Sequence, residues 1–286
     1  MKTKYNPSKE EKIMKKITFP EFVDKFNFTP ENTLKISVER EYFVADKNGN
    51  IKASGPKIAK WIGDLDQFDG DLPACQMESR LSLVTIDEVK PRLWEQECAL
   101  RDFETKFSFT RIFYEVGPED IPLDVNPKKR YVEIAEDLTE DELRPGCRVI
   151  ATHGHFGMPD FETALVVYNY MIDYLEELLE MGDGSNGERR RLYESMAPNH
   201  MPPKYDNVRD FYFTAQEQGF VEDPTKCWHW IRIHPNGTIE VRVFGTTKDI
   251  DKIYGWIKRC YDLIMEAMIK NNIKPVFGPV LGLVTA

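Results

Sequence analysis

The sequence predicts an α+β fold in which helices flank a mostly antiparallel sheet. Segments that alternate polar and apolar residues, as strands do, occur near the start, the middle and the end of the chain. Helical segments stand between and after them, so the order is strands, helix, strand, long helix, hairpin and helix. Because this order lacks regular βαβ alternation, a parallel sheet is not expected.

The first part of the chain contains two strands between a short and a long helix. FPEFVDKF, residues 19–26, is a short helix after a basic segment. Residues 34–45 are rich in β-branched and aromatic residues and end at the turn DKNGN, which is typical of a hairpin. Residues 74–85 form the second strand. Residues 86–107 form a helix whose period is set by Val89, Leu93, Glu97 and Leu100.

The second part begins with a turn-rich loop over residues 117–130 and a strand in THGHFGMPD, residues 152–160. Pro159 and Asp160 open the clearest helix, which ends at GDGSNG. A short helix over residues 207–218 precedes two strands, CWHWIRIH and TIEVRVF, joined by the turn PNG. The last amphipathic helix covers residues 249–270. The apolar stripe of the clearest helix comprises Phe161, Ala164, Leu165, Tyr168, Met171, Ile172, Leu175, Leu178 and Leu179.

The composition is that of an ordinary globular protein, with 286 residues, 41% hydrophobic and 30% charged. No flexible Gly/Ser run marks a boundary, so we expect one domain over residues 1–286, with residues 1–20 as a flexible or peripheral segment. The net charge of −10 argues against general binding to nucleic acid or to an anionic membrane, but not against a local cationic pocket. No apolar run approaches the roughly 20 residues of a membrane span, and the N-terminus lacks the apolar core of a signal peptide, so a cytoplasmic location is expected.

Two patterns exclude common functional classes. The five cysteines are odd in number and form no Cys-x-x-Cys pair, which argues against a disulfide framework and a thiolate zinc cluster. The segment 182–187, GDGSNG, matches G-x-G-x-x-G, but a dinucleotide fingerprint needs a strand before it. Because a long helix precedes the segment, we expect a loop that ends this helix.

The predicted strands each carry charged or polar residues on one face and apolar residues on the other. A single charged face is usually solvated, but five strands with Glu, His or Arg at alternate positions indicate faces that converge on one site. The apolar faces contain Val38, Tyr42, Met77, Ile231, Ile233, Ile239 and Val241. The polar faces contain Glu39 and Glu41; Gln76, Glu78 and Arg80; His153 and His155; Trp228, Trp230, Arg232 and His234; and Thr238, Glu240 and Arg242.

Converging carboxylates would repel one another and take up protons unless cations lay among them. Carboxylate oxygens suit Mg²⁺ or Mn²⁺, and arginines match the phosphate oxygens that bridge to such metals in phosphoryl transfer. A zinc hydrolase with His153 and His155 as ligands is the competing interpretation. It needs fewer carboxylates and gives the arginines no role.

The motifs SVEREYF, QME, THGHFGMPD and WHWIRIHPNGTIEVRV resemble, in order, those of the glutamate–cysteine ligase family 2, the carboxylate–amine ligases. The family pattern is close to G-V-E-x-E-F, Q-x-E, H-V-H-V-G and W-x-R-P-H-P-x-G-T-x-E-x-R. The resemblance extends from about residue 34 to residue 244. Ser37 replaces the glycine before V-E-x-E, and a Ser/Pro-rich loop near the family's substrate pocket is missing here.

The resemblance implies a glutamine-synthetase-like catalytic sheet that uses ATP with Mg²⁺ (or Mn²⁺) to join a carboxylate and an amine through an acyl phosphate. By the same resemblance, Glu39, Glu41, Glu78, His153 and Glu240 would be metal ligands. His155, Arg232 and Arg242 would face the ATP phosphates as catalytic residues. Met201-Pro-Pro203 is similar to the family's G-L-P-P, and one of Arg189, Arg190 and Arg191 would be its substrate-side arginine.

Two other functions stay open at this point. The same sheet could transfer phosphate to a guanidino or amine nitrogen without forming an amide, or it could bind a nucleotide without catalysis. The expected partners are small amino-acid and amine substrates. The sequence is compatible with a homo-oligomer but does not decide it.

Overall fold

The computed structural model describes residues 17–136 and 138–274, so residues 1–16 of the predicted peripheral segment lie outside the described range. The strands are β1 (Ile36–Ala45), β2 (Phe68–Gly70), β3 (Gln76–Val84), β4 (Thr110–Ile112), β5 (Thr152–Gly157), β6 (Ile231–His234) and β7 (Thr238–Phe244). The α-helices are α1 (Phe19–Val23), α2 (Gly55–Ile62), α3 (Ile86–Phe107), α4 (Lys129–Glu136), α5 (Glu140–Arg148), α6 (Phe161–Ile172), α7 (Leu175–Gly182), α8 (Glu188–Met196), α9 (Val208–Glu217) and α10 (Ile250–Lys270). Two short 3₁₀ helices are η1 (Pro30–Asn32) and η2 (Pro224–Lys226).

All seven strands of the described chain belong to one sheet, with the order β2-β3-β1-β5-β7-β6 and with β4 paired to the end of β1. Every pairing between these strands is antiparallel. The predicted α+β fold with an antiparallel sheet is therefore confirmed. Because β1 lies between β3 and β5, motifs that are far apart in the sequence become neighbours at the centre of the sheet.

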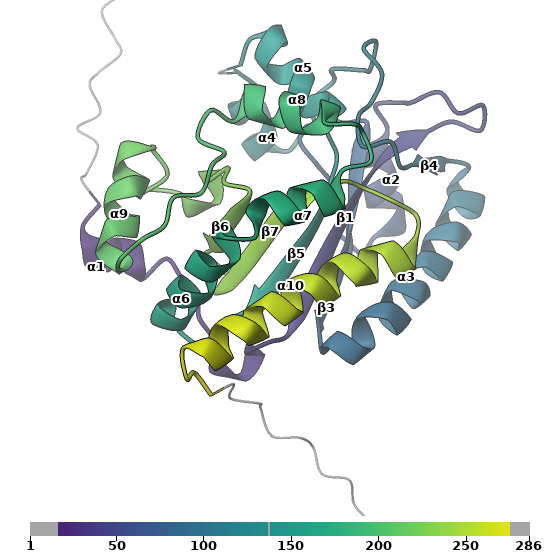
Figure 1. The fold of residues 1–286 in the computed structure, drawn as a ribbon. Helices are drawn as coiled ribbons and strands as arrows, with labels where there is room; N and C mark the ends of the chain where they lie inside the picture. Colours follow the sequence, from purple (N-terminus) through teal and green to yellow (C-terminus); the bar gives the residue numbers. More distant parts are fainter. Residues whose placement is uncertain (1–16, 137, 275–286) are drawn as a thin grey trace, which may run out of the picture.

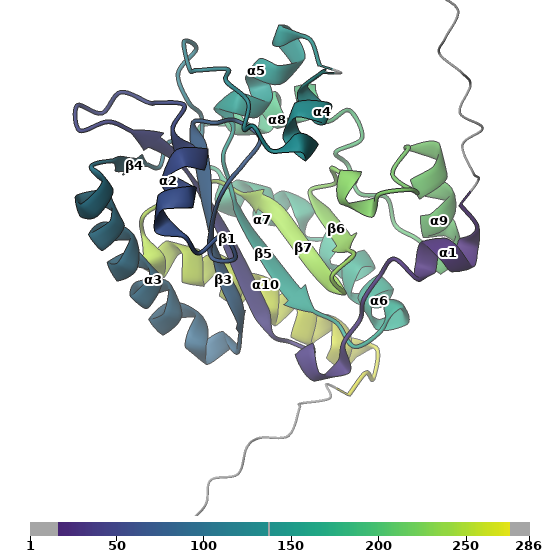
Figure 2. The same cartoon turned by 180° about the vertical axis from the view of Figure 1, so that it is seen from behind.

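Four helices cover one face of the sheet. Figure 1 shows α10 crossing this face with α3 on one side and α6 and α7 on the other. Seen from behind, in Figure 2, the opposite face is left open by these four helices, and α4, α5 and α8 lie beyond one end of the strands. The two faces of the sheet therefore have different environments, one packed against helices and one facing a cavity.

The packed face carries the apolar residues that the alternation predicts. The side chains of Val38, Tyr42, Met77 and Val241 are at most 1% exposed, and a fully buried side chain of this kind stabilises the fold by roughly 1.5–3 kcal/mol. Gly154 lies on this face between two histidines. A Cβ atom there would be 2.8 Å from the Cδ1 atom of Ile257 in α10, so only glycine lets helix and sheet approach this closely.

A buried charged cluster anchors β1 to the helical layer. Arg40 lies on the packed face, fully buried, and its Nη2 atom donates to Glu97 in α3 at 2.9 Å. Arg111 also donates two hydrogen bonds of 2.9 Å to Glu97. Burial would raise the pKa of Glu97, but the hydrogen bonds and charges of Arg111 and Arg40 outweigh it and lower this pKa to about 2. The carboxylate is therefore ionised and holds two buried guanidinium groups together.

Several elements differ from the predictions. The long helix is two helices, α6 and α7, since Tyr174 has non-helical backbone angles. The break lets α7 lie on β7, where a Cβ atom on Gly182 would be 2.8 Å from the Cα atom of Phe244. The DKNGN turn makes one bridge, between Ala45 and Ile51, and leads into α2 instead of a hairpin. Helices α4, α5 and α8 were not predicted.

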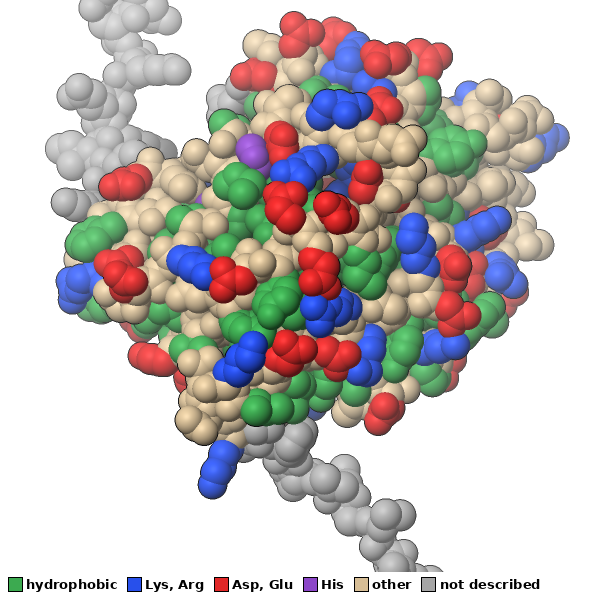
Figure 3. All heavy atoms as spheres, in the orientation of Figure 1, with side chains coloured by type: hydrophobic (Ala, Val, Ile, Leu, Met, Phe, Trp, Pro, Cys, Tyr) green, Lys and Arg blue, Asp and Glu red, His purple; other side chains and the backbone are tan. Residues whose placement is uncertain are grey.

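The outer surface of the helical layer is mixed in charge. Figure 3 shows basic and acidic side chains interspersed over α7 and α10, with apolar side chains between them. Some form ion pairs, such as Arg259 with Glu177 and Lys258 with Asp262. Such a surface gives no single-sign field that would attract a polyanion. Among the described residues, no helix is both long enough and apolar enough to cross a membrane.

Candidate active site

A cavity of about 570 Å³ lies over the open face of the sheet and beneath α4, α5 and α8. Three groups of residues line it. Its acidic floor consists of Glu39, Glu41, Asp71 and Glu78, with His153 beside them. Its arginines are Arg80, Arg130, Arg189, Arg232 and Arg242. Its apolar roof consists of Tyr131, Ile134, Leu138, Leu143, Met196 and Pro198.

The strand register brings the predicted residues together from four motifs. Glu41 in β1 lies opposite Glu78 in β3, and Glu39 lies opposite His153 in β5. On the next strand pair, His155 lies opposite Glu240 in β7, which in turn lies opposite Arg232 in β6. Side chains opposite each other in neighbouring strands are close enough to interact directly. The predicted convergence of charged faces is thus present in the structure.

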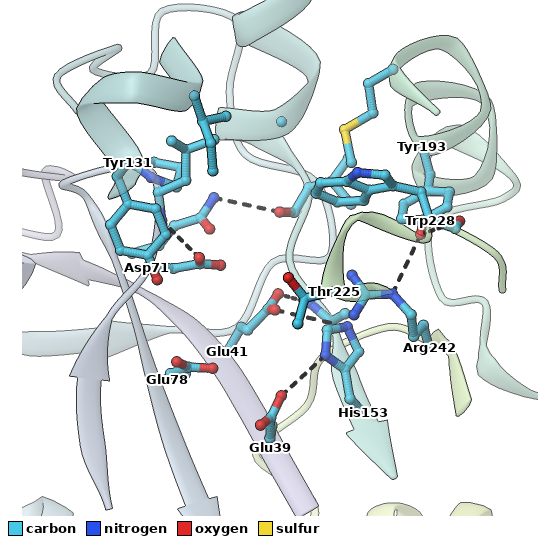
Figure 4. A pocket seen from close by; sticks show the side chains of 18 of the residues that line it. Glu39, Glu41, Asp71, Glu78, Tyr131, His153, Tyr193, Thr225, Trp228 and Arg242 are labelled. Atoms are coloured by element: carbon cyan, nitrogen blue, oxygen red, sulfur yellow. Dashed lines mark hydrogen bonds and ion pairs between the residues drawn. The ribbon is translucent and has the colours of Figure 1, made fainter. Parts of the chain in front are cut away.

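His153 is at the centre of the acidic side chains (Figure 4). Its Nδ1 atom is 3.5 Å from Glu39 and 3.9 Å from Glu240, and its Nε2 atom is 3.8 Å from Glu41. Burial, together with the positive charge of Arg242, lowers the pKa of His153 to about 4. The imidazole is therefore neutral at pH 7, which is the form that can ligate a metal.

The positively charged neighbours of the acidic floor are too few to compensate all of its carboxylates. Burial, followed by the charge of Asp71, raises the pKa of Glu41 to about 8. Burial and the charges of Glu39 and Asp71 likewise raise the pKa of Glu78 well above its usual value. Glu39 differs, because the charge of His155 and hydrogen bonds from the histidines outweigh burial and lower its pKa. A cluster of hard oxygen donors that holds protons for want of positive charge fits a divalent cation such as Mg²⁺ or Mn²⁺.

Glu240 and His155 lie in contact with the floor but not among the residues that line the cavity. Glu240 is fully buried, and its carboxylate accepts hydrogen bonds from Arg232, at 2.6 Å, and from Arg242. These two charges outweigh burial and keep the pKa of Glu240 well below its usual value. The Nδ1 atom of His155 is 3.1 Å from the hydroxyl of Thr238, and its buried Nε2 atom faces the carboxylate of Glu39 at 3.6 Å.

The tightest grouping of metal-ligand atoms in the described chain is a different one. Ligand atoms of His155, His234 and Glu240 lie within 4.8 Å of one another. Two arginines already compensate the single carboxylate of this group, whereas the acidic floor has carboxylates in excess. The floor is therefore the better site for a divalent cation, and this triad is a second, less charged candidate.

The two predicted phosphate-facing arginines both donate to Glu240 and differ in their other partners. Arg242 points into the cavity beside Trp228 (Figure 4), donates to Glu240 and lies with its Nε atom 3.4 Å from the hydroxyl of Tyr193. Arg232 donates to Glu240 and, through one Nη atom, to the carbonyl groups of Thr225 and Cys227 at 2.8 and 2.5 Å. Among the described residues, the Nη2 atom of each arginine has no hydrogen-bond partner, so both present a donor to the cavity.

The three consecutive arginines of α8 point in different directions, as successive residues of a helix must. Arg189 lines the cavity, but its three guanidinium nitrogens donate to the carbonyl groups of Ile150, Val243 and Arg242 at 2.8–3.1 Å. Arg190 forms ion pairs with Glu176 and Glu194 instead. Neither Arg190 nor Arg191 is among the residues that line the cavity. The structure therefore brings only Arg189 to the predicted site, with its donors already used by the backbone.

Sequence reasoning missed several lining residues. Asp71 follows β2, a strand of three residues that is too short to show alternation. The acidic run GDLDQFDGDLP was a signal that could have found it. Trp228 and Trp230 were expected on one strand face, but β6 begins at Ile231. Trp228 is 43% exposed and borders the cavity, whereas Trp230 is fully buried.

The cysteines are all free, and four of them are buried. Burial raises the pKa of Cys75 and Cys147 to about 12 and that of Cys227 to about 11. A protonated thiol is a poor nucleophile at neutral pH. No cysteine lines the cavity among the described residues. The segment 182–187 connects α7 to α8, so its place after a helix, as predicted, excludes the dinucleotide fingerprint.

Curated proteins named as putative glutamate–cysteine ligases are similar to this chain. No model of a protein family matches the chain. "Putative glutamate--cysteine ligase 2-1" of Rhodococcus jostii (strain RHA1) is 24% identical over 73% of this chain and 61% of its own length. "Putative glutamate--cysteine ligase 2" of Gloeobacter violaceus (strain ATCC 29082 / PCC 7421) is 28% identical over 76% and 64%. The predicted resemblance to glutamate–cysteine ligase family 2 is confirmed.

The chain spans a little over six tenths of the length of these two relatives. The fold also has a solved counterpart. A crystal structure of a bifunctional glutathione synthetase from Pasteurella multocida aligns over 84% of this chain and 40% of its own, with a TM-score of 0.56 and 11% identity. At this identity the likeness shows a shared fold.

Proposed function

We propose that the protein is an ATP-dependent carboxylate–amine ligase, similar to glutamate–cysteine ligase, that forms an amide through an acyl phosphate. One observation carries the proposal. A single cavity combines an acidic floor that has carboxylates in excess with two arginines, Arg232 and Arg242, that Glu240 holds beside it. Metal-bridged phosphate and compensating arginines are what a phosphoryl transfer between two substrates needs. Relatives named as glutamate–cysteine ligases support the same reaction class.

The residues would have two roles, metal binding and phosphate binding. Glu39, Glu41, Glu78, His153 and Glu240, the ligands predicted from sequence, would hold Mg²⁺ or Mn²⁺. Such an ion, when bound, withdraws charge from the phosphate oxygens. Arg242 would face the transferring phosphate, with Arg232 and His155 behind it. Glu240 would fix both arginines through its two oxygens.

The covalent steps need no nucleophile from the protein. The substrate carboxylate attacks the terminal phosphorus of ATP, the bond to the bridging oxygen breaks, and ADP leaves. The amine then attacks the carbonyl carbon of the acyl phosphate, loses a proton and expels phosphate. The protein contributes position and charge compensation, which are the main sources of rate in phosphoryl transfer.

We propose that one catalytic domain acts on small molecules. The test is phosphate release from ATP in a matrix of carboxylic acids and amines, with each left out in turn. The proposal requires release that depends on ATP, an acid and an amine together. Glu78→Gln should abolish it, whereas Glu95→Gln, on the exposed side of α3, should not. Phosphorylation of an amine without any acid would indicate a phosphotransferase. ATP binding without turnover for any pair would indicate a non-catalytic protein.

A further inference from the structure

Helix α4 borders the cavity, and its apolar residues do not pack into a hydrophobic core of the described chain. None of its residues is fully buried, although it carries Tyr131 and Ile134 one turn apart. The hydrophobic clusters of the described chain include neither of these residues, nor Leu138 just after the helix. All three line the cavity. An apolar helix face that meets no protein core but faces a cavity is suited to an apolar ligand group.

The charges on this side of the cavity oppose an anionic ligand group. Figure 4 shows Tyr131 above Asp71, on the side of the cavity away from Arg242. Two of the cations are already paired: Arg80, which lines the cavity, with Glu78, and Lys128, which precedes α4, with Asp69 at 2.5 Å. A ligand group that reaches Tyr131 therefore meets carboxylates and apolar side chains.

Arg130 is the exception on this side. Its Nη2 atom is 3.5 Å from the hydroxyl of Thr225, and its side chain is exposed at the rim. It lines the cavity on the side of Thr225 and is not one of the apolar residues of the roof.

The opposite side of the cavity has the features that a nucleotide needs. Trp228 borders it with an exposed ring, and Arg242 lies 5.6 Å from the centre of that ring. An aromatic face and an open guanidinium suit a base and its phosphates. The nucleotide and the apolar roof are therefore assigned to different sides.

We propose that the amine substrate is a primary amine with an alkyl or aryl body and no carboxylate of its own, which packs against the α4 part of the roof. This inference rests on the proposed function. The ammonium group would lie toward Asp71, which is not one of the proposed metal ligands and lies beneath Tyr131 (Figure 4). The apolar body would lie against Tyr131, Ile134 and Leu138. Cysteine, or any amino acid used as the amine, would instead bring its carboxylate to an acidic surrounding.

The test compares amines that differ in one group. Phosphate release is measured with ATP, a panel of carboxylic acids, and either 2-phenylethylamine or phenylalanine, which differ only in the carboxylate. We expect kcat/KM to be at least tenfold higher for 2-phenylethylamine, and to rise about fourfold for each methylene from ethylamine to butylamine. Phenylalanine or cysteine as the better substrate overturns the inference but leaves the proposed ligase intact. No phosphate release with any pair rejects the proposed function itself.

Variants of α4 locate the effect. Ile134→Lys should lower kcat/KM for butylamine at least tenfold and leave the KM for ATP unchanged, and Ile134→Ala should lower it by a smaller factor in a fully folded protein. Val132→Lys is the matched control, because Val132 is on the same helix, 37% exposed and outside the cavity lining. It should change neither constant. If Ile134→Lys raises the KM for ATP and spares the amine, the roof holds the adenine and the inference is wrong.

Discussion

The cluster of Arg40, Glu97 and Arg111 offers the sharpest test of how the catalytic strand is held. Arg40 stands between Glu39 and Glu41 in β1 but points to the opposite face, where Glu97 is its ionic partner at 2.9 Å. Replacing Glu97 by glutamine keeps the shape of the side chain and removes its charge. Arg40 would then be buried without its ionic partner, and Arg111 would keep only Glu104, at 3.1 Å.

The magnitude follows from the pKa of Glu97. A free glutamate has a pKa of about 4.3, and the surroundings lower that of Glu97 to about 2. This difference corresponds to about 3 kcal/mol of stability at neutral pH, a value within the usual cost of breaking a buried ion pair. Because the folded-state pKa is depressed, the contribution is present above pH 4.3 and is lost as the pH falls toward 2.

Urea unfolding of the wild-type protein and of Glu97→Gln, at several pH values, measures the effect. We expect the variant to be about 3 kcal/mol less stable at pH 7, and the difference to shrink between about pH 5 and pH 2. Glu95→Gln, on the same helix but 62% exposed, should cost less than about 0.5 kcal/mol. A cost below 1 kcal/mol for Glu97→Gln, or a difference that does not change with pH, would refute the reasoning.

Three further predictions concern the cavity and its surroundings. Glu240→Ala and Arg242→Ala should each lower turnover by more than about 3 kcal/mol in transition-state stabilisation, whereas Val241→Ala, on the packed face, should cost about 2 kcal/mol of stability and little activity; the reverse pattern in kinetics and unfolding would invert the face assignment. Mg²⁺ without nucleotide, at ten times its Kd, should stabilise the folded protein by about 1.4 kcal/mol, and Glu78→Gln should remove this increment; tightly held zinc that is needed for folding would contradict it. Alanine at each cysteine should leave single-turnover rates nearly unchanged, and a folded variant without turnover would indicate a thioester; the positions are Cys75, Cys98, Cys147, Cys227 and Cys260.

The alternation of polar and apolar residues predicted the long strands and the charged faces that meet in the site. It did so because successive side chains of a strand point to opposite faces, and here one face is packed against helices and the other lines the site. The bounds of α3, Ile86–Phe107, were also predicted as found. Thr85 and Glu88 form a capping box at its start. Ionisable side chains at alternate positions, Glu39 and Glu41 in β1 and Glu240 and Arg242 in β7, indicated the open face of these strands.

The alternation of polar and apolar residues breaks where a charged residue lies on the packed side of a strand. Arg40 reads as part of a charged run, yet it is fully buried because Glu97, 57 residues away, compensates it. Distant backbone carbonyls that occupy Arg189 are equally invisible in the sequence. Helices α4 and α5 have only eight and nine residues, which is too short for a helical period to stand out in the sequence. The roof of the cavity was therefore not predicted.

Oxygen transfer from the acid to phosphate tests the central claim most directly. The acid that supports turnover is labelled with ¹⁸O in its carboxylate, and the products are examined by mass spectrometry. Attack of the carboxylate on the terminal phosphate, followed by the amine, leaves one labelled oxygen in inorganic phosphate and one in the amide. We predict this distribution. Label in AMP, or unlabelled phosphate together with a formed amide, would contradict the acyl-phosphate reaction and the placing of Arg242 at the transferring phosphate.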